Sequence, residues 1–230
     1  MLMLLSGCAR ENGRVDARDY QAFWLWAGVQ PQPVLDKART VYVLDSELRD
    51  GANALTPLRP AVPRVPGKEL WLVTRAETLD WPDGTTARLV RRLDDWRAAG
   101  NSVAGLQVDF DARTRHLDRY VEFLRQLRRD LPPQYRLSIT GLMDWSAHGD
   151  PAELQVLAGT VDEVVIQTYQ GRATIAGYEA YFARMGREFP VPFKVGLVQG
   201  GAWKVPPGLE QQPGFRGYVI FLVNPVKRRK

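Results

Sequence analysis

The chain has 230 residues, of which 45% are hydrophobic and 25% charged, and its formal net charge is +5. This composition argues against a disordered chain and against a bundle of membrane-spanning helices. The length suits one sizeable core, and we expect one domain over residues 20–230 after a polar leader over residues 9–19. Basic residues occur in pairs on predicted helices and in a terminal run, which is typical of solvated faces, so no nucleic-acid partner is expected.

The N-terminus carries the single cysteine of the chain. Leu5-Ser6-Gly7-Cys8 follows an apolar run and resembles a bacterial lipobox. The resemblance implies that residues 1–8 are a truncated lipoprotein signal and that acylated Cys8 holds the protein to a membrane of the cell envelope, on its periplasmic or outer side. The alternative is a chance match in a cytoplasmic protein, because the apolar run is short and no Lys or Arg precedes it.

Eight short β-rich runs alternate with Gly/Pro punctuation and helical segments. Helices are predicted over residues 85–99, 114–131 and 176–189, whereas the first two crossovers look like loops or one short helix. The chain therefore predicts an α/β fold, a (β/α)8 TIM-like barrel that is compact or irregular, with some crossover helices short or missing. The predicted strands cover residues 21–26, 40–44, 69–74, 103–110, 135–142, 163–169, 193–198 and 217–223.

The fourth run ends in two carboxylates. Strand alternation places Gln107, Asp109 and Asp111 on one face together with Gly105. Carboxylates on a buried strand are costly, but they are tolerated at the carboxyl end of a parallel barrel strand, where ligands bind. The pattern favours a barrel that cleaves sugars. Because glycoside hydrolysis needs an acid and a group that stabilises the cationic centre, Asp111 and Asp109 could divide those roles.

The segment from Ala104 to Asp111 resembles the fourth-strand signature of family 18 (chitinase-like) glycoside hydrolases, D-G-x-D-x-D-x-E. Gly105 and Asp109 match it, whereas Ala104 and Gln107 depart from it. Asp111 stands where that family has its general-acid Glu, and its carboxyl is one methylene shorter. The resemblance implies that Asp111 is the acid; either the substrate sits closer or the family chemistry is lost.

Two further segments resemble the same family. Residues 165–169, which include Gln167, resemble a strand whose final tyrosine, here Tyr169, contacts the acetamido group of the substrate. Phe221 stands about where a tryptophan usually floors the sugar site. Over nearly its whole length the chain resembles the family called domain of unknown function 3142, which is grouped with the glycoside-hydrolase barrels, and this resemblance implies the fold.

Other residues complete the predicted site. Gln107 and Gln167 are expected to bind substrate, and Asp45 and Asp144 are reserve carboxylates at predicted strand ends. Trp145 and Trp203 lie near carboxyl ends and are expected to stack on sugars, whereas Trp24, Trp26, Trp71 and Trp96 are expected in the core. The two histidines build no site, so neither a metal nor a cofactor is expected.

Structural alternatives remain open for three of the site residues: Asp111, Asp109 and Tyr169. Asp111 could cap the following helix, a position for which Thr114 competes. Asp109 could pair with an inward Arg or Lys, and Tyr169 could be an ordinary rim aromatic. The leading hypothesis is a glycoside hydrolase acting on an amino-sugar-containing envelope or extracellular polysaccharide. The runner-up is an inactive glycan-binding or assembly lipoprotein, and the third is a structural surface protein.

Overall fold

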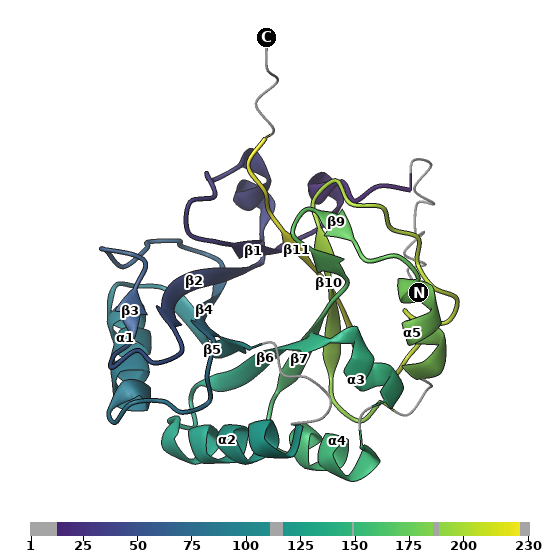
Figure 1. Cartoon of the computed structure of the whole chain (residues 1–230). Helices are drawn as coiled ribbons and strands as arrows, with labels where there is room; N and C mark the ends of the chain where they lie inside the picture. The colour runs from purple at the N-terminus through teal and green to yellow at the C-terminus, as the bar shows by residue number, and fades with distance from the viewer. Residues whose placement is uncertain (1–12, 111–116, 149, 186–188, 226–230) are drawn as a thin grey trace, which may run out of the picture.

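The computed structural model describes residues 13–110, 117–148, 150–185 and 189–225. Eight parallel strands form a closed barrel, because β1 pairs with β11 on one side and with β2 on the other (Figure 1). This confirms the predicted TIM-like barrel. The strands are β1 (Ala22–Leu25), β2 (Thr40–Leu48), β4 (Glu69–Ala76), β5 (Ser102–Asp109), β6 (Arg136–Leu142), β7 (Glu163–Gln167), β10 (Phe193–Val198) and β11 (Phe215–Phe221).

The barrel is irregular, as predicted, because several crossovers lack an α-helix. The β1–β2 crossover contains only the 3-10 helix η2 (Pro33–Lys37), and the β2–β4 crossover contains the short strand β3 (Thr56–Pro57). Residues 199–214, between β10 and β11, contain no helix. The helices in the described residues are α1 (Thr85–Ala98), α2 (Leu117–Asp130), α3 (Met143–His148), α4 (Pro151–Ala158) and α5 (Tyr178–Met185), with the 3-10 helix η1 (Ala17–Asp19) before β1.

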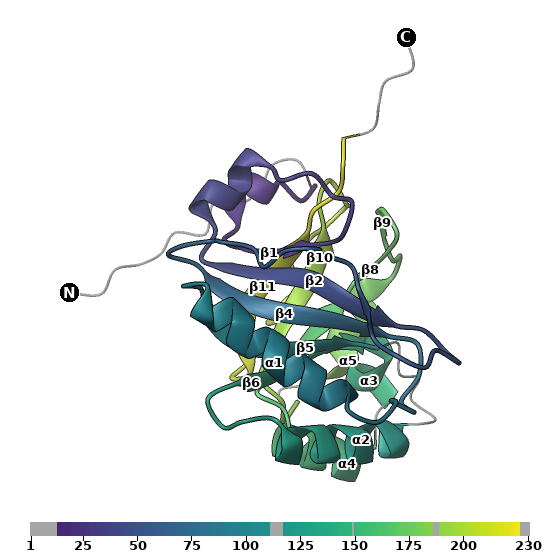
Figure 2. The same ribbon diagram turned by 90° about the vertical axis from the view of Figure 1, so that its left-hand side faces the viewer.

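Helices α1 and α2 coat the outside of the sheet (Figure 2). The predicted apolar stripe of α2 is buried, and its charged residues occupy the opposite face. None of the helices in the described part of the chain has both the length and the apolar character required to cross a membrane.

The predicted sixth run divides into two elements. β7 ends at Gln167, and Tyr169 belongs to a separate hairpin of β8 (Tyr169–Gln170) and β9 (Ala173–Thr174). Tyr169 pairs antiparallel with Thr174 instead of continuing the barrel ladder. This hairpin stands at the carboxyl end of the barrel (Figure 2), so Tyr169 lies at the edge of that end.

Large aromatic rings fill the barrel, and glycines make room for them. Trp24, Tyr42 and Trp71 are fully buried in its interior. A Cβ atom on Gly196 would lie 2.7 Å from the Trp24 ring. A Cβ atom on Gly105 would lie 1.9 Å from the carbonyl oxygen of Arg136 on β6. The glycine of the fourth-strand pattern is therefore required by the close approach of β5 to β6.

Candidate active site

The carboxyl ends of the barrel strands surround one face of the molecule, which we call the mouth. Asp109 ends β5 there, and its Oδ1 accepts a 2.9 Å hydrogen bond from Thr140 Oγ1 on β6. The Asp109 residue is only 8% exposed. Arg75, the register partner of Asp109 on β4, shares that face of the sheet and is exposed. The mouth therefore contains a buried carboxylate with a hydroxyl donor, next to an exposed cation.

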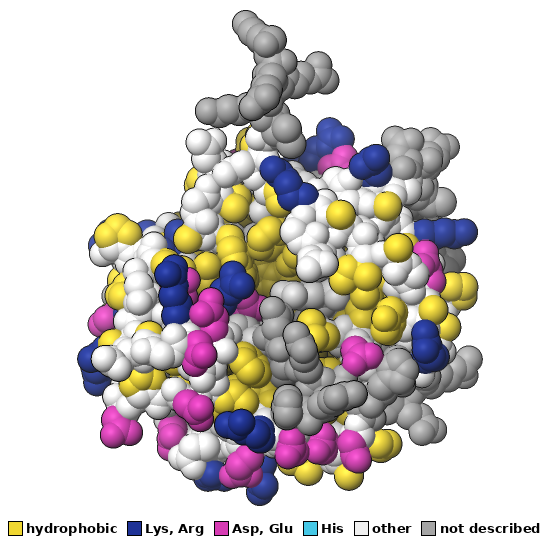
Figure 3. All heavy atoms as spheres, in the orientation of Figure 1, with side chains coloured by type: hydrophobic (Ala, Val, Ile, Leu, Met, Phe, Trp, Pro, Cys, Tyr) yellow, Lys and Arg dark blue, Asp and Glu magenta, His cyan; other side chains and the backbone are white. Residues whose placement is uncertain are grey.

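Three aromatic residues form what we call the aromatic mouth cluster: Trp26, Tyr169 and Phe221. Tyr169 and Phe221 stack with 5.3 Å between ring centroids, and Trp26 meets Phe221 edge-on at 5.3 Å. All three are partly buried and pack above the buried Trp24. Figure 3 shows hydrophobic side chains gathered near the centre of this face. Partly exposed rings of this kind suit the apolar C–H faces of a sugar.

Gln167 lies on the inward face of β7. It alternates with Val165, which is buried inside the barrel, and its residue is partly exposed. The register pairs Val165 with Thr140 and Gln167 with Leu142 on β6, so Gln167 lies two residues nearer the mouth than the level of Thr140. Gln167, Tyr169 and Asp109 thus belong to the same end of the barrel, as predicted, although their roles toward a substrate remain predictions.

The expectation that Gln107 binds substrate needs correction. Gln107 is fully buried, its Oε1 accepts a 2.6 Å hydrogen bond from Trp24 Nε1, and its Nε2 donates a 2.9 Å hydrogen bond to Ser138 Oγ. Both ends of the amide are engaged inside the barrel. A buried amide with satisfied partners fixes side chains of the core and presents no group to a ligand at the mouth.

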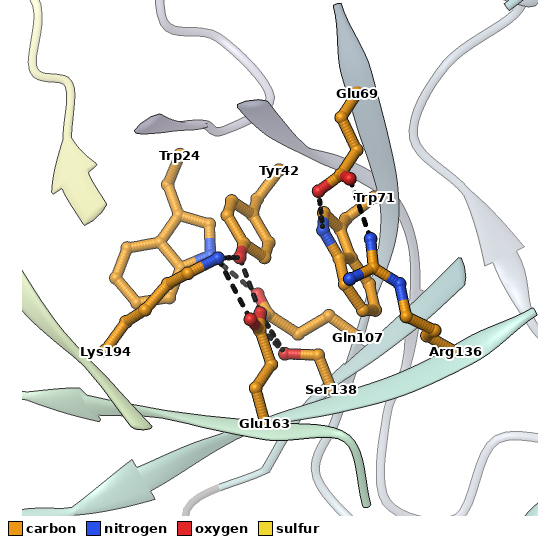
Figure 4. A network of polar contacts seen from close by, with 9 residues as sticks. All are labelled: Trp24, Tyr42, Glu69, Trp71, Gln107, Arg136, Ser138, Glu163 and Lys194. Carbon is orange, nitrogen blue, oxygen red and sulfur yellow. Dashed lines mark hydrogen bonds and ion pairs between the residues drawn. The ribbon is translucent and has the colours of Figure 1, made fainter. Parts of the chain in front are cut away.

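Gln107 is one member of an interior network with Trp24, Ser138, Tyr42, Glu163 and Lys194 (Figure 4). Glu163 Oε1 accepts hydrogen bonds from Tyr42 (2.5 Å) and Ser138 (3.1 Å), while Glu163 Oε2 lies 2.9 Å from Lys194 Nζ. Lys194 also donates to the Tyr42 hydroxyl at 2.8 Å. Burial, reinforced by the negative charge of Glu163, raises the pKa of Tyr42 well above its usual value.

The charged members of the interior network lie at the amino end of the barrel, opposite the mouth. Glu163 is the first residue of β7 and Lys194 the second residue of β10. A second ion pair, Arg136 with Glu69 at 2.8 Å, lies at the same end, and its guanidinium covers the Trp71 ring (Figure 4). In TIM barrels this end generally serves stability, so we assign both ion pairs to the scaffold.

The reserve carboxylate Asp45 lies outside the mouth. A register irregularity between Leu44 and Ser46 accompanies its outward orientation, and the Asp45 carboxylate is bound by the Arg92 guanidinium of α1. The hydrogen bond from Arg92 to Asp45 raises the pKa of Arg92. Asp45 therefore faces α1 and not the mouth that contains Asp109. The expectation that Asp45 is a reserve carboxylate of the site was wrong. Asp144 is partly buried in the first turn of α3, directly after β6.

The expected stacking tryptophans also need correction. Trp145 is 1% exposed and packs against Tyr120 of α2. Trp203 is 6% exposed and stacks on Tyr178 of α5 with 4.6 Å between centroids. Neither ring has an open face for a sugar, because helices cover both. Trp26, expected in the core, instead belongs to the aromatic mouth cluster.

Some predicted residues fall outside the described residues. These are Asp111, Cys8, Thr114 and His116. Within the described ranges, no group of three or more His, Cys, Asp or Glu side chains could hold a metal ion.

Sequence reasoning missed three polar residues near the mouth: Thr140, Arg75 and Arg59. Strand alternation contained the signal for the first two, because Thr140 lies at an inward position of the fifth run and Arg75 continues the inward face directly after the third run. Arg59 carried no comparable signal, because it follows β3 in a loop. Its guanidinium donates to the carbonyl oxygens of Leu44 (2.8 Å) and Leu25 (3.3 Å), and burial lowers its pKa.

The fold resembles solved chitinase-like structures at low sequence identity. The tamarind chitinase-like lectin has 11% identity and a TM-score of 0.52, with 88% of this chain and 94% of that chain covered. The chitinase domain of spore coat protein CotE from Clostridium difficile has 12% identity and a TM-score of 0.50, with 76% and 64% covered. The Bacillus cereus spore cortex-lytic enzyme SleL has 17% identity and a TM-score of 0.44, with 77% and 50% covered. The chain thus spans half to about two thirds of these two bacterial proteins.

The sequence matches one family model and no curated protein. The sequence model described as "Domain of unknown function (DUF3142)" matches residues 75–190, which is half of the chain. This region begins at the end of β4 and includes β5, β6 and β7. The chain belongs to the DUF3142 family.

Proposed function

We propose that this protein is a glycoside hydrolase that binds a polysaccharide at the mouth and cleaves it with a carboxylic acid. The observation that carries the proposal is that Asp109 and the aromatic mouth cluster belong to the same open end of the barrel. An apolar wall with a few polar groups is the usual composition of a small-ligand site. The similarity to a chitinase domain and to a chitinase-like lectin supports a saccharide as the ligand.

The chemical step assigned to the site is general-acid hydrolysis. Asp111 protonates the glycosidic oxygen and the bond from that oxygen to the anomeric carbon breaks. Water then adds to the cationic carbon and gives up a proton to the Asp111 carboxylate, which restores the acid. Asp109, two residues earlier on β5, stabilises the developing positive charge or the substrate's own acetamido group, and Thr140 holds its carboxylate. The role of Asp111 rests on the sequence pattern. The amino-sugar preference rests on the Tyr169 resemblance.

The second candidate is a binding protein without turnover. Two observations favour it: an Asp replaces the Glu of the family 18 pattern at position 111, and the lectin is covered over 94% of its length. A shorter carboxyl would leave the leaving oxygen without its proton while the aromatic wall still bound sugar. The two candidates share one site and differ only in catalysis.

Turnover of N-acetylglucosamine oligomers and of envelope polysaccharide separates the candidates. For a hydrolase, the wild-type chain releases reducing ends, and Asp111→Asn abolishes release while oligosaccharide affinity and melting temperature stay unchanged. For a binding protein, oligosaccharide binds to the wild type and to Asp111→Asn, and neither protein releases reducing ends. Full activity in Asp111→Asn would remove the assignment of the acid.

We further propose that the protein is held to the bacterial cell envelope through an acyl group on Cys8, as the lipobox-like sequence suggests. This proposal is independent of the barrel chemistry. Metabolic labelling with a radioactive fatty acid should mark the wild-type protein and leave Cys8→Ser unmarked. Equal labelling of both, or none of the wild type, would contradict it.

A further inference from the structure

A cavity with basic walls lies at the amino end of the barrel, opposite the mouth. It has a volume of about 510 Å³, within the range of small-ligand sites. We call it the basic cavity and define it by the five cationic residues in its wall: Arg18, Lys37, Arg39, Lys194 and Arg216.

The cationic residues come from segments far apart in the sequence. Arg18 belongs to η1, Lys37 ends η2, and Arg39 stands just before β2. Lys194 and Arg216 lie near the starts of β10 and β11. A charge run that only keeps a helix solvated would lie on one element. Here closure of the barrel brings these residues to one hollow.

Positive charge prevails in the basic cavity after its carboxylates are counted. Asp19 is part of the wall, Asp16 pairs with Arg18 at 2.5 Å, and Glu163 pairs with Lys194 at 2.9 Å. Five cations therefore face three carboxylates. Within the residues that the structure describes, neither Lys37 nor Arg39 forms an ion pair.

Lys194 connects the cavity to the barrel interior. Its side chain is 16% exposed, and its ammonium group contacts Tyr42 and Glu163. An ammonium group has three N–H donors, and these two contacts engage two of them. Arg216 is already positioned, because its Nη1 donates to the carbonyl oxygens of Pro213 and Phe215.

We propose that the basic cavity binds a phosphate group. Several converging cations with unused N–H donors recognise phosphate through charge-assisted hydrogen bonds. The ligand is either a phosphorylated small molecule or the headgroup of an anionic lipid, both of which present the same chemistry. This site lies at the other end of the barrel from the proposed sugar site and does not depend on it.

The test uses the full chain and two sources of phosphate. Binding of inorganic phosphate is measured by calorimetry against chloride at equal ionic strength, and vesicles of phosphatidylglycerol are compared with vesicles of phosphatidylcholine. Binding of phosphate or selective binding of the anionic vesicles supports the site and identifies the source. The double variant Lys37→Gln/Arg39→Gln should bind whichever source is active about tenfold more weakly.

The matched control removes two positive charges elsewhere. Arg88 and Arg91 are exposed on α1, outside the basic cavity, so Arg88→Gln/Arg91→Gln should bind as the wild type does. Lys37 and Arg39 are also exposed, so both double variants should keep the wild-type melting temperature. The proposal is overturned if neither phosphate source binds the wild type, or if the two double variants lose affinity equally.

Discussion

Thr140 on β6 donates a 2.9 Å hydrogen bond to the Asp109 carboxylate on β5, and this contact fixes the one buried carboxylate of the described residues that faces the mouth. A hydrogen bond to a charged group contributes about 1.5–3 kcal/mol. Thr140→Val should therefore lower turnover by about tenfold or more, measured as initial rates of reducing-end release.

A matched substitution controls for the loss of a threonine hydroxyl. Thr160, also buried, donates to the Val156 carbonyl oxygen in α4, away from the mouth. Thr160→Val should lower the melting temperature without changing the rate. Equal rates for Thr140→Val and the wild type would mean that this hydrogen bond does not serve catalysis.

The aromatic mouth cluster should carry sugar affinity. Trp26→Ala and Phe221→Ala each remove a partly exposed ring, and each should weaken oligosaccharide binding by about 1 kcal/mol, or roughly fivefold, in calorimetric titration. Trp81 is a matched control, because its partly buried ring packs against Phe123 on the outside of the barrel. If Trp81→Ala reduces affinity as much as the cluster variants do, the effect is not local to the mouth.

Loss of one partner of the Lys194–Glu163 ion pair should destabilise the fold more than loss of both charges. Lys194→Met leaves Glu163 buried without its cation, which should cost about 3–5 kcal/mol of unfolding free energy. Removing the charge of Glu163 as well, in Lys194→Met/Glu163→Gln, should restore a large part of that loss. Urea denaturation measures both values, and a double variant no more stable than the single variant would contradict this account.

Two buried tyrosines predict a loss of stability in alkali. The pKa of Tyr42 is raised by burial, and that of Tyr135, which donates to Asp94 at 2.6 Å, is raised to about 12. Unfolded tyrosines ionise near pH 10, so above that pH the unfolded chain has lost protons that the folded chain keeps. The contribution of these tyrosines to the unfolding free energy should therefore be fully present below about pH 10. It should decrease between about pH 10 and 12.

Denaturant titrations between about pH 10 and 12 measure whether the unfolding free energy falls as predicted. Tyr135→Phe should show a shallower fall than the wild type, because the variant has one fewer phenol to ionise on unfolding. A free energy of unfolding that stays constant or rises between about pH 10 and 12 would contradict the prediction.

The fold could be predicted because strands and a coating helix leave periodic patterns. The apolar stripe of α2 and the run from residue 193 to 198 map onto their observed elements directly. Tyr169 did not continue its strand, because pairing with Thr174 depends on a contact that alternation does not encode. Strand alternation correctly predicted that Asp109 lies on the inward face, because side chains alternate between the two faces of a strand.

The site could be predicted only in part. Alternation gives the face of a side chain but not its depth, so Gln107 and Asp109 looked equivalent although only Asp109 reaches the mouth. Proximity to a strand end also failed for Trp145 and Trp203, because helices that pack over them are fixed by tertiary structure. Asp45 was misplaced by a register irregularity that no local pattern revealed.

An NMR titration that follows the tryptophan indole N–H resonances tests the central claim most directly. During addition of an N-acetylglucosamine oligomer, the account predicts a shift of the Trp26 resonance and no shift of the buried Trp145 and Trp203 resonances. Movement of Trp145 or Trp203 with Trp26 unchanged, or no movement of any indole resonance across a panel of envelope oligosaccharides, would contradict the placement of a sugar site at the mouth.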